Sequence, residues 1–274
     1  MKANTRRANR SAFDEVADVY DTARPGIPHD LVTSIVRETG LAPGDQVLEV
    51  GAGSGQLTLP LRAARVEVTA LEPGGRLRCL LAKHTADDPG ITVTGGFFED
   101  YTAPGGSFAA VVSANAWQWI DPAVSYGKAA DLLIGGGHLA LIWNFPIVAD
   151  PTLQQGLNEV LALDYPDAVR DPATHLSGIE VRAAEGRAEL AASGHFEAIS
   201  WQVSHDSLRL VPDAYYKLLL SYANAAVLDE SARADLFERA GAVLAEHGAE
   251  TVEMDNVLYA CVARLAGIVR TVTD

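Results

Sequence analysis

The stretch that decides the fold is VLEVGAGSGQL, residues 47–57. Its first half, which contains the acid Glu49, predicts a strand that leads directly into glycines at 51, 53 and 55. In an open α/β sheet, ligands bind beyond the carboxyl ends of the strands, and a glycine turn there lets a nucleotide-like cofactor approach the bare backbone. A dinucleotide-binding turn needs glycine at its sixth position, where this chain has Gln56. The spacing therefore disfavours a dinucleotide.

The composition predicts an ordinary globular protein with one sizeable core. The chain has 274 residues, 48% of them hydrophobic, and its 21 basic and 36 acidic residues give a net charge of −15. We expect no nucleic-acid partner, because such affinity rests on Lys and Arg replacing counterions. Cys79 and Cys261 lie far apart without neighbouring ligands, so we expect neither a disulfide framework nor a metal site.

The chain shows no predicted targeting or membrane segment. Its basic start is followed by the polar stretch FDEVADVYD and not by an apolar run. No apolar run approaches the roughly eighteen residues of a membrane span. With two isolated cysteines, these features lead us to expect a cytoplasmic protein.

Strand and helix patterns alternate up to about residue 145. Short β-rich runs at 46–50, 65–72, 91–97, 108–114 and 138–144 predict five strands, and helical patterns fill 75–85 and 125–135. Upstream, residues 28–40 read as a helix between Pro28 and Gly40, preceded by a short amphipathic helix from Phe13 to Tyr20. The alternation predicts an α/β fold with a doubly wound, mostly parallel sheet.

The pattern changes after residue 145. We expect strands at 195–205 and 250–265, which bring the sheet to seven, and helices at 212–228 and 230–248. The predicted organisation is an N-terminal lid and first helix (1–40), a cofactor-binding core (41–149), an inserted helical cap (150–193) and a C-terminal part that completes the sheet (194–274), with a further cap helix at 212–228.

The glycine stretch resembles motif I of class I S-adenosylmethionine-dependent methyltransferases, hh(D/E)hGxGxG. The resemblance implies their seven-stranded, Rossmann-like fold and S-adenosyl-L-methionine as the cofactor. It also implies that the loop backbone lies against the methionine portion of the cofactor. Glu72, seventeen positions after Gly55, stands where the family places an acid that accepts hydrogen bonds from both ribose hydroxyls. The implied loop contacts are Glu49, Gly51, Ala52, Gly53, Gly55 and Gln56, followed by Glu72 and Pro73 after the second strand.

Two later stretches extend the resemblance. In TGGFFED, Phe97 stands where the family contacts adenine and Phe98 where it offers a backbone donor, and the aromatic at 97 suggests stacking in place of the frequent acid. FAAVVSANAWQWID resembles the fourth strand of the methyltransferase type 11 and trans-aconitate methyltransferase-like group. There Ala114 and Asn115 would face the methionine end of the cofactor.

The N-terminal stretch FDEVADVYDTARPGIP resembles the lid helix of the same group. Tyr20 and Arg24 then have two readings, as lid contacts to the methionine end or as packing residues of an N-terminal helix. Both readings stay open at this point. We expect the helix to close over the cofactor and exclude water.

Aromatic residues gather where a methyl acceptor would bind. We predict a substrate pocket lined by Trp117, Trp143, Tyr216 and Tyr222, whose ring faces would suit a sulfonium cation. Trp119 and Tyr215 fit a core position at least as well. No catalytic residue stands out, since His205 and His175, the two candidate bases, read more readily as solvated histidines.

The sequence predicts S-adenosylmethionine-dependent methyl transfer to a small, partly apolar metabolite. O-methylation is favoured, with C- or N-methylation open. Orienting the acceptor is the main task, because a sulfonium methyl is already activated. The alternative is a cyclase, isomerase or sensing protein that keeps the sulfonium without transferring methyl. The sequence identifies neither the acceptor nor the oligomeric state.

Overall fold

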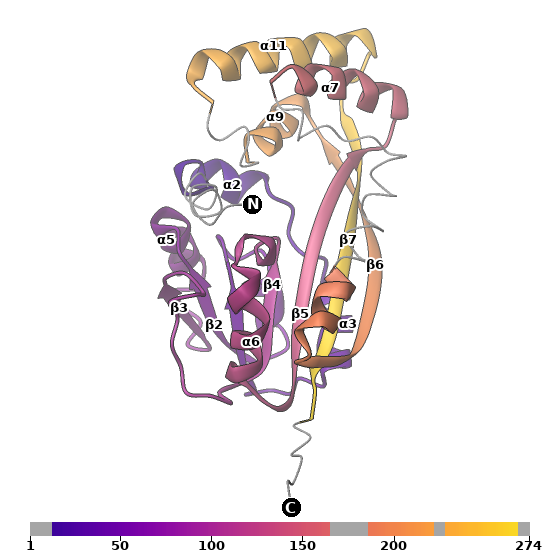
Figure 1. The fold of residues 1–274 in the computed structure, drawn as a ribbon. Coiled ribbons are helices and arrows are strands. Elements are labelled where there is room, and N and C mark those ends of the chain that lie inside the picture. The colour runs from indigo at the N-terminus through magenta and orange to yellow at the C-terminus, as the bar shows by residue number, and fades with distance from the viewer. Residues whose placement is uncertain (1–12, 165–185, 222–227, 268–274) are drawn as a thin grey trace, which may run out of the picture.

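A computed structural model describes residues 13–164, 186–221 and 228–267 (Figure 1). Seven strands form one sheet in the order β3-β2-β1-β4-β5-β7-β6, in which only β7 runs antiparallel to its neighbours. The predicted doubly wound, mostly parallel sheet is confirmed. The strands are β1 (Gln46–Val50), β2 (Glu67–Glu72), β3 (Ile91–Gly95), β4 (Phe108–Ala114), β5 (Leu133–Val148), β6 (Phe196–Leu210) and β7 (Val252–Leu265).

The strand order reverses between β1 and β4. The chain moves outward from β1 to β3 and then returns to pair β4 with the free side of β1. The crossover segments after β1 and β4 therefore diverge to opposite sides, which leaves a crevice above the carboxyl ends of these two strands. The turn 51–57 opens into this crevice.

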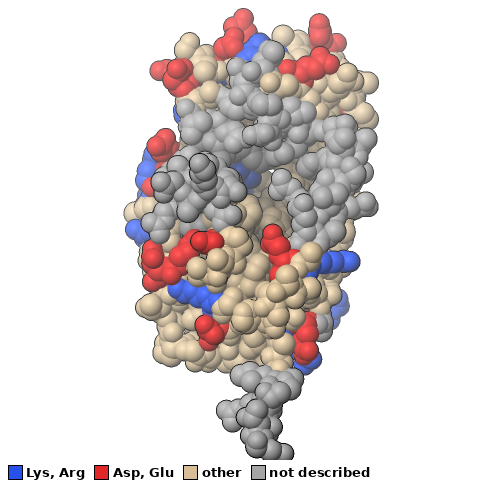
Figure 2. All heavy atoms as spheres, viewed as in Figure 1, with Lys and Arg blue, Asp and Glu red and all other residues tan. Residues whose placement is uncertain are grey.

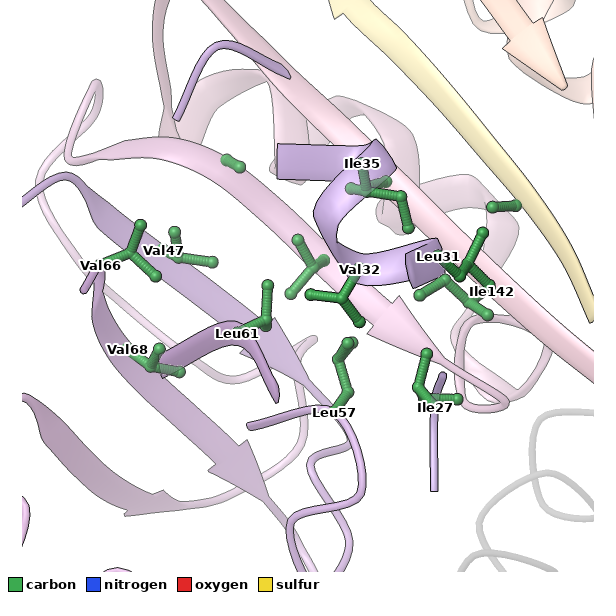
Figure 3. Close-up of a cluster of buried hydrophobic side chains, with 14 of the residues drawn as sticks. Ile27, Leu31, Val32, Ile35, Val47, Leu57, Leu61, Val66, Val68 and Ile142 are labelled. Carbon is green, nitrogen blue, oxygen red and sulfur yellow. The ribbon is translucent and has the colours of Figure 1, made fainter. Parts of the chain in front are cut away.

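One face of the sheet is covered by α3 (His29–Thr39), α4 (Thr58–Arg62) and α5 (Gly75–His84). Ile35 of α3 and Leu61 of α4 belong to one cluster with Val47, Val68 and Ile142 of the strands (Figure 3), and all five are buried. Because side chains alternate between the two faces of a strand, the intervening residues of these strands pack in a second core on the opposite face of the sheet. That opposite core contains Tyr126, Ala129 and Leu132 of α6 (Pro122–Leu132), with Leu48, Val111, Leu139 and Leu141 from the strands.

Three long strands carry a helical cap. β5, β6 and β7 have 16, 15 and 14 residues and run beyond the rest of the sheet to α7 (Pro151–Asp164), α9 (Pro212–Leu220) and α11 (Glu230–Glu246) (Figure 1). The cap has its own core, which includes Leu157, Leu218 and Leu236. α11, which the sequence did not assign to a cap, is therefore part of it.

The N-terminal helix α2 (Ala17–Ala23) bridges core and cap, between α5 and α9 in Figure 1. Before it, the carboxylate of Asp14 accepts hydrogen bonds from the backbone N–H groups of Arg76 and Leu77 at 2.7 and 3.0 Å, in the first turn of α5. After it, Nη2 of Arg24 donates to the carbonyl of Ser221 at 3.0 Å, at the end of α9. Both ends of this segment are thus anchored.

Several local features differ from the sequence prediction. α4 and the short 3-10 helix η1 (Trp117–Trp119) were not expected, because five and three residues are too few to show a periodic pattern. α6 ends at Leu132, and the glycines at 135–137 lie inside β5. Among the described residues no helix is long and apolar enough to cross a membrane.

Ile35 tests the packing of α3 on the sheet. Its side chain is 2% exposed, so Ile35→Ala should lower the free energy of unfolding by about 2–5 kcal/mol through lost burial and a residual cavity. Thr33→Ala on the exposed side of the same helix should change it by less than about 0.5 kcal/mol. Urea denaturation measures both, and equal effects would show that this face of α3 is not a core contact.

Candidate functional site

A cavity lies at the strand-order switch between β1 and β4, and we call it the switch-point cavity. It encloses about 720 Å³ of space not filled by atoms, part of it open to solvent. Two aromatic side chains, Phe13 and Trp119, line it and contact each other edge to face at 6.0 Å. The predicted site residues that line it are Tyr20, Arg24, Gly51, Gly53, Glu72, Pro73, Phe97, Phe98, Ala114 and Asn115.

The glycine turn leaves no room for side chains where it meets the cavity. Gly51 and Gly53 have φ angles of 74° and 59°, which glycine adopts without strain. A Cβ at Gly51 would lie 2.3 Å from Cβ of Ala116, and one at Gly53 would lie 3.3 Å from the ring of Tyr20. The turn is therefore a cradle of bare backbone under the N-terminal helix.

Glu72 joins two turns at the cavity wall. Its Oε2 accepts a hydrogen bond from the Gly53 N–H at 2.8 Å, and its Oε1 accepts one from the Gly74 N–H at 2.7 Å. Burial raises the pKa of this carboxyl, and the two backbone N–H groups oppose the rise. Each carboxylate oxygen has a second acceptor site, so the group can still accept both hydroxyls of a vicinal diol. The residues present thus suit the ribose of a nucleoside cofactor.

Glu49 is the second buried acid of the site. Its side chain is 1% exposed, and the Thr58 hydroxyl donates to its Oε2 at 2.6 Å. Burial raises the pKa of Glu49 to about 8, the Thr58 hydrogen bond opposes the rise, and the nearby Glu72 adds to it. The carboxyl is therefore largely protonated at neutral pH.

A second cavity lies beside the first, and we call it the lid-side cavity. It encloses about 350 Å³ and is lined by the predicted residues Glu49, Ala52 and Gln56, together with Asn144 at the outer part of β5. Both cavities share Tyr20, Arg24, Gly51, Ala114 and Asn115 as lining residues. Ligands bound in the two cavities would therefore lie next to each other at these five residues.

Asn115 holds the end of β4 in an unusual conformation at this junction. Its φ angle is 56°, in the left-handed region that asparagine tolerates better than most residues. Its backbone N–H donates to the Ile142 carbonyl, and its Oδ1 accepts from the Asn144 N–H, both at 2.9 Å. These bonds fix the ends of β4 and β5 side by side.

Tyr20 and Arg24 cover the junction from above. Burial raises the pKa of the Tyr20 hydroxyl, and the Arg24 guanidinium lies 5.2 Å from the centre of the Tyr20 ring. On the outer side of the helix, Asp21 lies 3.4 Å from Nε2 of His84, which is on α5. Tyr20 and Arg24 thus line both cavities, and the segment that carries them is also anchored by packing.

Three of the four aromatic residues predicted to line an acceptor pocket line neither of the two cavities. Trp117 is buried between Phe98 and Tyr126, with ring centroids 5.7 Å from each. Trp143 stacks on Trp201 at 6.3 Å, on the face of β5 opposite to Asn144. Tyr216 stacks on Phe237 at 4.9 Å inside the cap core. None of the three lines either cavity, and Tyr222 lies outside the described residues.

Two other residues singled out in the sequence, Gly55 and His205, also lie away from the cavities. Gly55 lies against Leu81 of α5, because a Cβ added to this glycine would come within 3.1 Å of Cδ1 of Leu81. The absence of a side chain at Gly55 therefore allows close packing of the turn on α5. His205 is 59% exposed and pairs with Asp255 at 2.9 Å, which agrees with the solvated reading. His175 lies outside the described residues.

Sequence reasoning missed Asn144 as a lining residue. The sequence pattern of β5 could have indicated it. Side chains alternate along the strand, so Asn144 lies on the same side as Ala140 and Ile142, which belong to the core facing α3. A polar residue at the next step outward marks the point where that core gives way to a cavity. Trp143, the neighbouring aromatic residue, lies on the other face of β5 and stacks on Trp201.

Comparison with known proteins agrees with this geometry. Residues 47–137 match the family described as "Methyltransferase domain". An uncharacterized methyltransferase of Mycobacterium tuberculosis is 31% identical over 172 residues, which cover 62% of this chain and 66% of that protein. The chain thus spans just under two thirds of the length of this relative.

Solved structures share the fold at low sequence identity. A protein from Anaeromyxobacter dehalogenans assigned as a type II methyltransferase superposes with a TM-score of 0.61 at 22% identity, covering 88% of this chain and 96% of that one. A [4+2]-cyclase superposes with a TM-score of 0.50 at 15% identity, covering 86% of this chain and 80% of that one. At these identities the likeness concerns the fold alone.

The protonation of Glu49 predicts a pH-dependent stability. Its folded-state pKa of about 8 lies above the ordinary 4.5, so the folded chain holds a proton that the unfolded chain has lost between these values. The stabilisation from this proton is complete below pH 4.5 and is lost as the pH rises toward 8. Relative to Glu49→Gln, the wild type should lose up to about 1.4 kcal/mol per pH unit in this window.

Urea denaturation of both proteins at intervals from pH 5 to 9 measures this difference. Glu49→Gln is a matched control, because the amide keeps the side-chain volume and an acceptor for the Thr58 hydroxyl. Parallel stability curves for the two proteins would show that Glu49 titrates normally in the folded state.

Proposed function

We propose that this chain, whose residues 47–137 form a class I S-adenosylmethionine-dependent methyltransferase domain, transfers a methyl group from that cofactor to a small acceptor. One observation carries the proposal. The bare glycine turn, the buried Glu72 carboxylate and the end of β4 meet in one cavity beneath the N-terminal helix. The stretch FAAVVSANAWQWID supports the type 11 and trans-aconitate methyltransferase-like group within this class.

The residues of the switch-point cavity suit the parts of the cofactor in turn. Glu72 would accept the ribose hydroxyls, since it lines the cavity and its two oxygens are held in place by the backbone N–H groups of Gly53 and Gly74. Phe97, Pro73 and Leu77 provide apolar walls for the adenine. Gly51, Ala114 and Asn115 would lie against the methionine end, where the two cavities meet. When bound, the cofactor supplies an activated methyl group on a sulfonium cation.

The protein's contribution to the reaction is orientation and exclusion of water. An acceptor in the lid-side cavity would share lining residues with the methionine end, which brings the nucleophile next to the methyl group. Tyr20 and Arg24 roof this junction, and Asp14 and Arg24 anchor their segment to α5 and α9. Since the lid-side cavity is small and has both polar and apolar lining residues, the acceptor is a small, partly apolar metabolite, with O-methylation favoured over C- or N-methylation.

Surface charge supports a small acceptor over nucleic acid. On the face shown in Figure 2, acidic and basic side chains are interspersed among the described residues. The chain as a whole carries a net charge of −15, which opposes binding to a phosphate backbone.

Transfer of label from methyl-tritiated S-adenosylmethionine tests the function. Incubation with a small-molecule metabolite extract should move tritium into a new low-molecular-weight product. Gly53→Val, whose side chain would enter the space beneath Tyr20, should abolish the transfer. Binding of S-adenosylhomocysteine without any transfer would favour the alternative function of a cyclase, isomerase or sensing protein. One of the solved structures with a similar fold is a [4+2]-cyclase. Label in a nucleic-acid fraction would contradict the small acceptor.

A double-variant cycle tests the role of Glu72. A carboxylate that accepts ribose hydroxyls should favour S-adenosylhomocysteine over its 2′,3′-dideoxy analogue by about tenfold or more, at roughly 1.5–3 kcal/mol per charged hydrogen bond. Glu72→Gln should lose most of this preference, while Glu67→Gln at the opposite end of β2 should keep it. Calorimetric titration of both ligands gives the four affinities. An unchanged preference in Glu72→Gln would separate Glu72 from the diol.

A further inference from the structure

Polar side chains continue one core face of the sheet beyond its apolar part. Ala140 and Ile142 of β5 belong to the core that faces α3, so Asn144 points to the same side. Leu258 and Ala260 of β7 likewise belong to this core, and Asn256 is the next residue outward on that side. Where apolar residues would extend the core, both strands carry an asparagine.

Asn144 is buried with an unsatisfied hydrogen-bond acceptor. Its side chain is 9% exposed and lines the lid-side cavity, and its Oδ1 has no hydrogen-bond partner. A buried acceptor without a partner costs about 1–3 kcal/mol, which a leucine of similar size would avoid. Such a group at a cavity wall is accounted for by a ligand that donates to it.

Asn256 of β7 also has unsatisfied hydrogen-bonding atoms. It is fully buried, and neither its Oδ1 nor its Nδ2 has a hydrogen-bond partner. It pairs across the strands with Pro146, so it is the diagonal neighbour of Asn144 on this face. Two neighbouring carboxamides on this face thus carry unsatisfied hydrogen-bonding atoms, and Asn144 is the one of the two that lines the cavity.

The charges around the cavity favour a neutral ligand. The ionisable residues that line it are Arg24 and Glu49, and the Glu49 carboxyl is largely protonated at neutral pH. The Arg24 guanidinium is engaged with the Ser221 carbonyl, and the Glu49 carboxyl with the Thr58 hydroxyl. A buried cationic group on the acceptor would therefore lack a counter-ion, and an anionic group would have to displace the Ser221 carbonyl from Arg24, so either charge is costly in such a place. The apolar residues Ile27 and Leu57 line the same cavity and offer apolar contacts to the rest of the ligand.

We propose that Asn144 is a specificity-determining residue that holds the methyl acceptor through a neutral donor-and-acceptor group, such as a carboxamide or a lactam. This inference rests on the proposed function. The Asn144 N–H is bonded to Oδ1 of Asn115, so an acceptor held by the Asn144 side chain lies beside the end of β4, where the methyl group would be presented. The carboxamide of Asn144 can both accept from and donate to such a group.

Three isosteric probes test the inference: benzamide, benzamidinium and benzoate, which share one planar shape and differ in charge. Each is titrated by NMR into the full-length protein saturated with S-adenosylhomocysteine. The wild type should bind benzamide most tightly. Asn144→Leu should weaken benzamide binding by about tenfold, the equivalent of one lost hydrogen bond. Asn144→Asp, which places a carboxylate at the same point, should reverse the preference toward benzamidinium.

A matched control comes from α7. Asn158 is also 9% exposed but has a hydrogen bond from Gln154 and lines neither cavity, so Asn158→Leu should leave the preference for benzamide unchanged. Equal affinity for the three probes, a preference for benzoate, no saturable benzamide binding, or no effect of either Asn144 variant would overturn the proposal. Failure of the wild type to bind S-adenosylhomocysteine would overturn the proposed function, and the acceptor subsite with it.

Discussion

The buried carboxylate of Glu72 is the interaction on which the site depends. Its two oxygens bind the N–H groups of Gly53 and Gly74, which belong to the turns after β1 and β2. One side chain thus fixes the separation of two turns and the opening of the switch-point cavity. Burial alone would favour the protonated acid, and the two N–H groups counteract this by stabilising the carboxylate. The bare backbone of Gly53 is useful only because Glu72 holds it in position.

The alternation of side chains along the strands connects this site to the core. On the face covered by α3 and α4, apolar residues such as Val47 and Ile142 form the core near the middle of the sheet. Toward the carboxyl ends of β1 and β5, the same face presents Glu49 and Asn144 to the lid-side cavity. The strands that stabilise the fold therefore also position the polar groups of the site. The long strands β5 and β7 extend the same face of the sheet to the cap.

The fold and the cofactor turn could be predicted because their signals are local. Glu49, Gly51 and Gly53 lie within five residues, and the conformation of that turn depends on neighbours in the sequence. The acceptor pocket could not be read in the same way. Tyr216 packs on Phe237 because α9 and α11 meet in the cap, and Trp143 stacks on Trp201 of β6, far away in the sequence. Such contacts are decided by tertiary packing, which residue type alone does not reveal.

The most direct measurement is a crystal structure of the full chain with S-adenosylhomocysteine. We expect the two ribose hydroxyls within hydrogen-bonding distance of the Glu72 oxygens, the adenine beside Phe97, and the sulfur facing the junction of the two cavities at Ala114 and Asn115. A cofactor bound outside the switch-point cavity, or one bound in it with the ribose away from Glu72, would contradict the assignment.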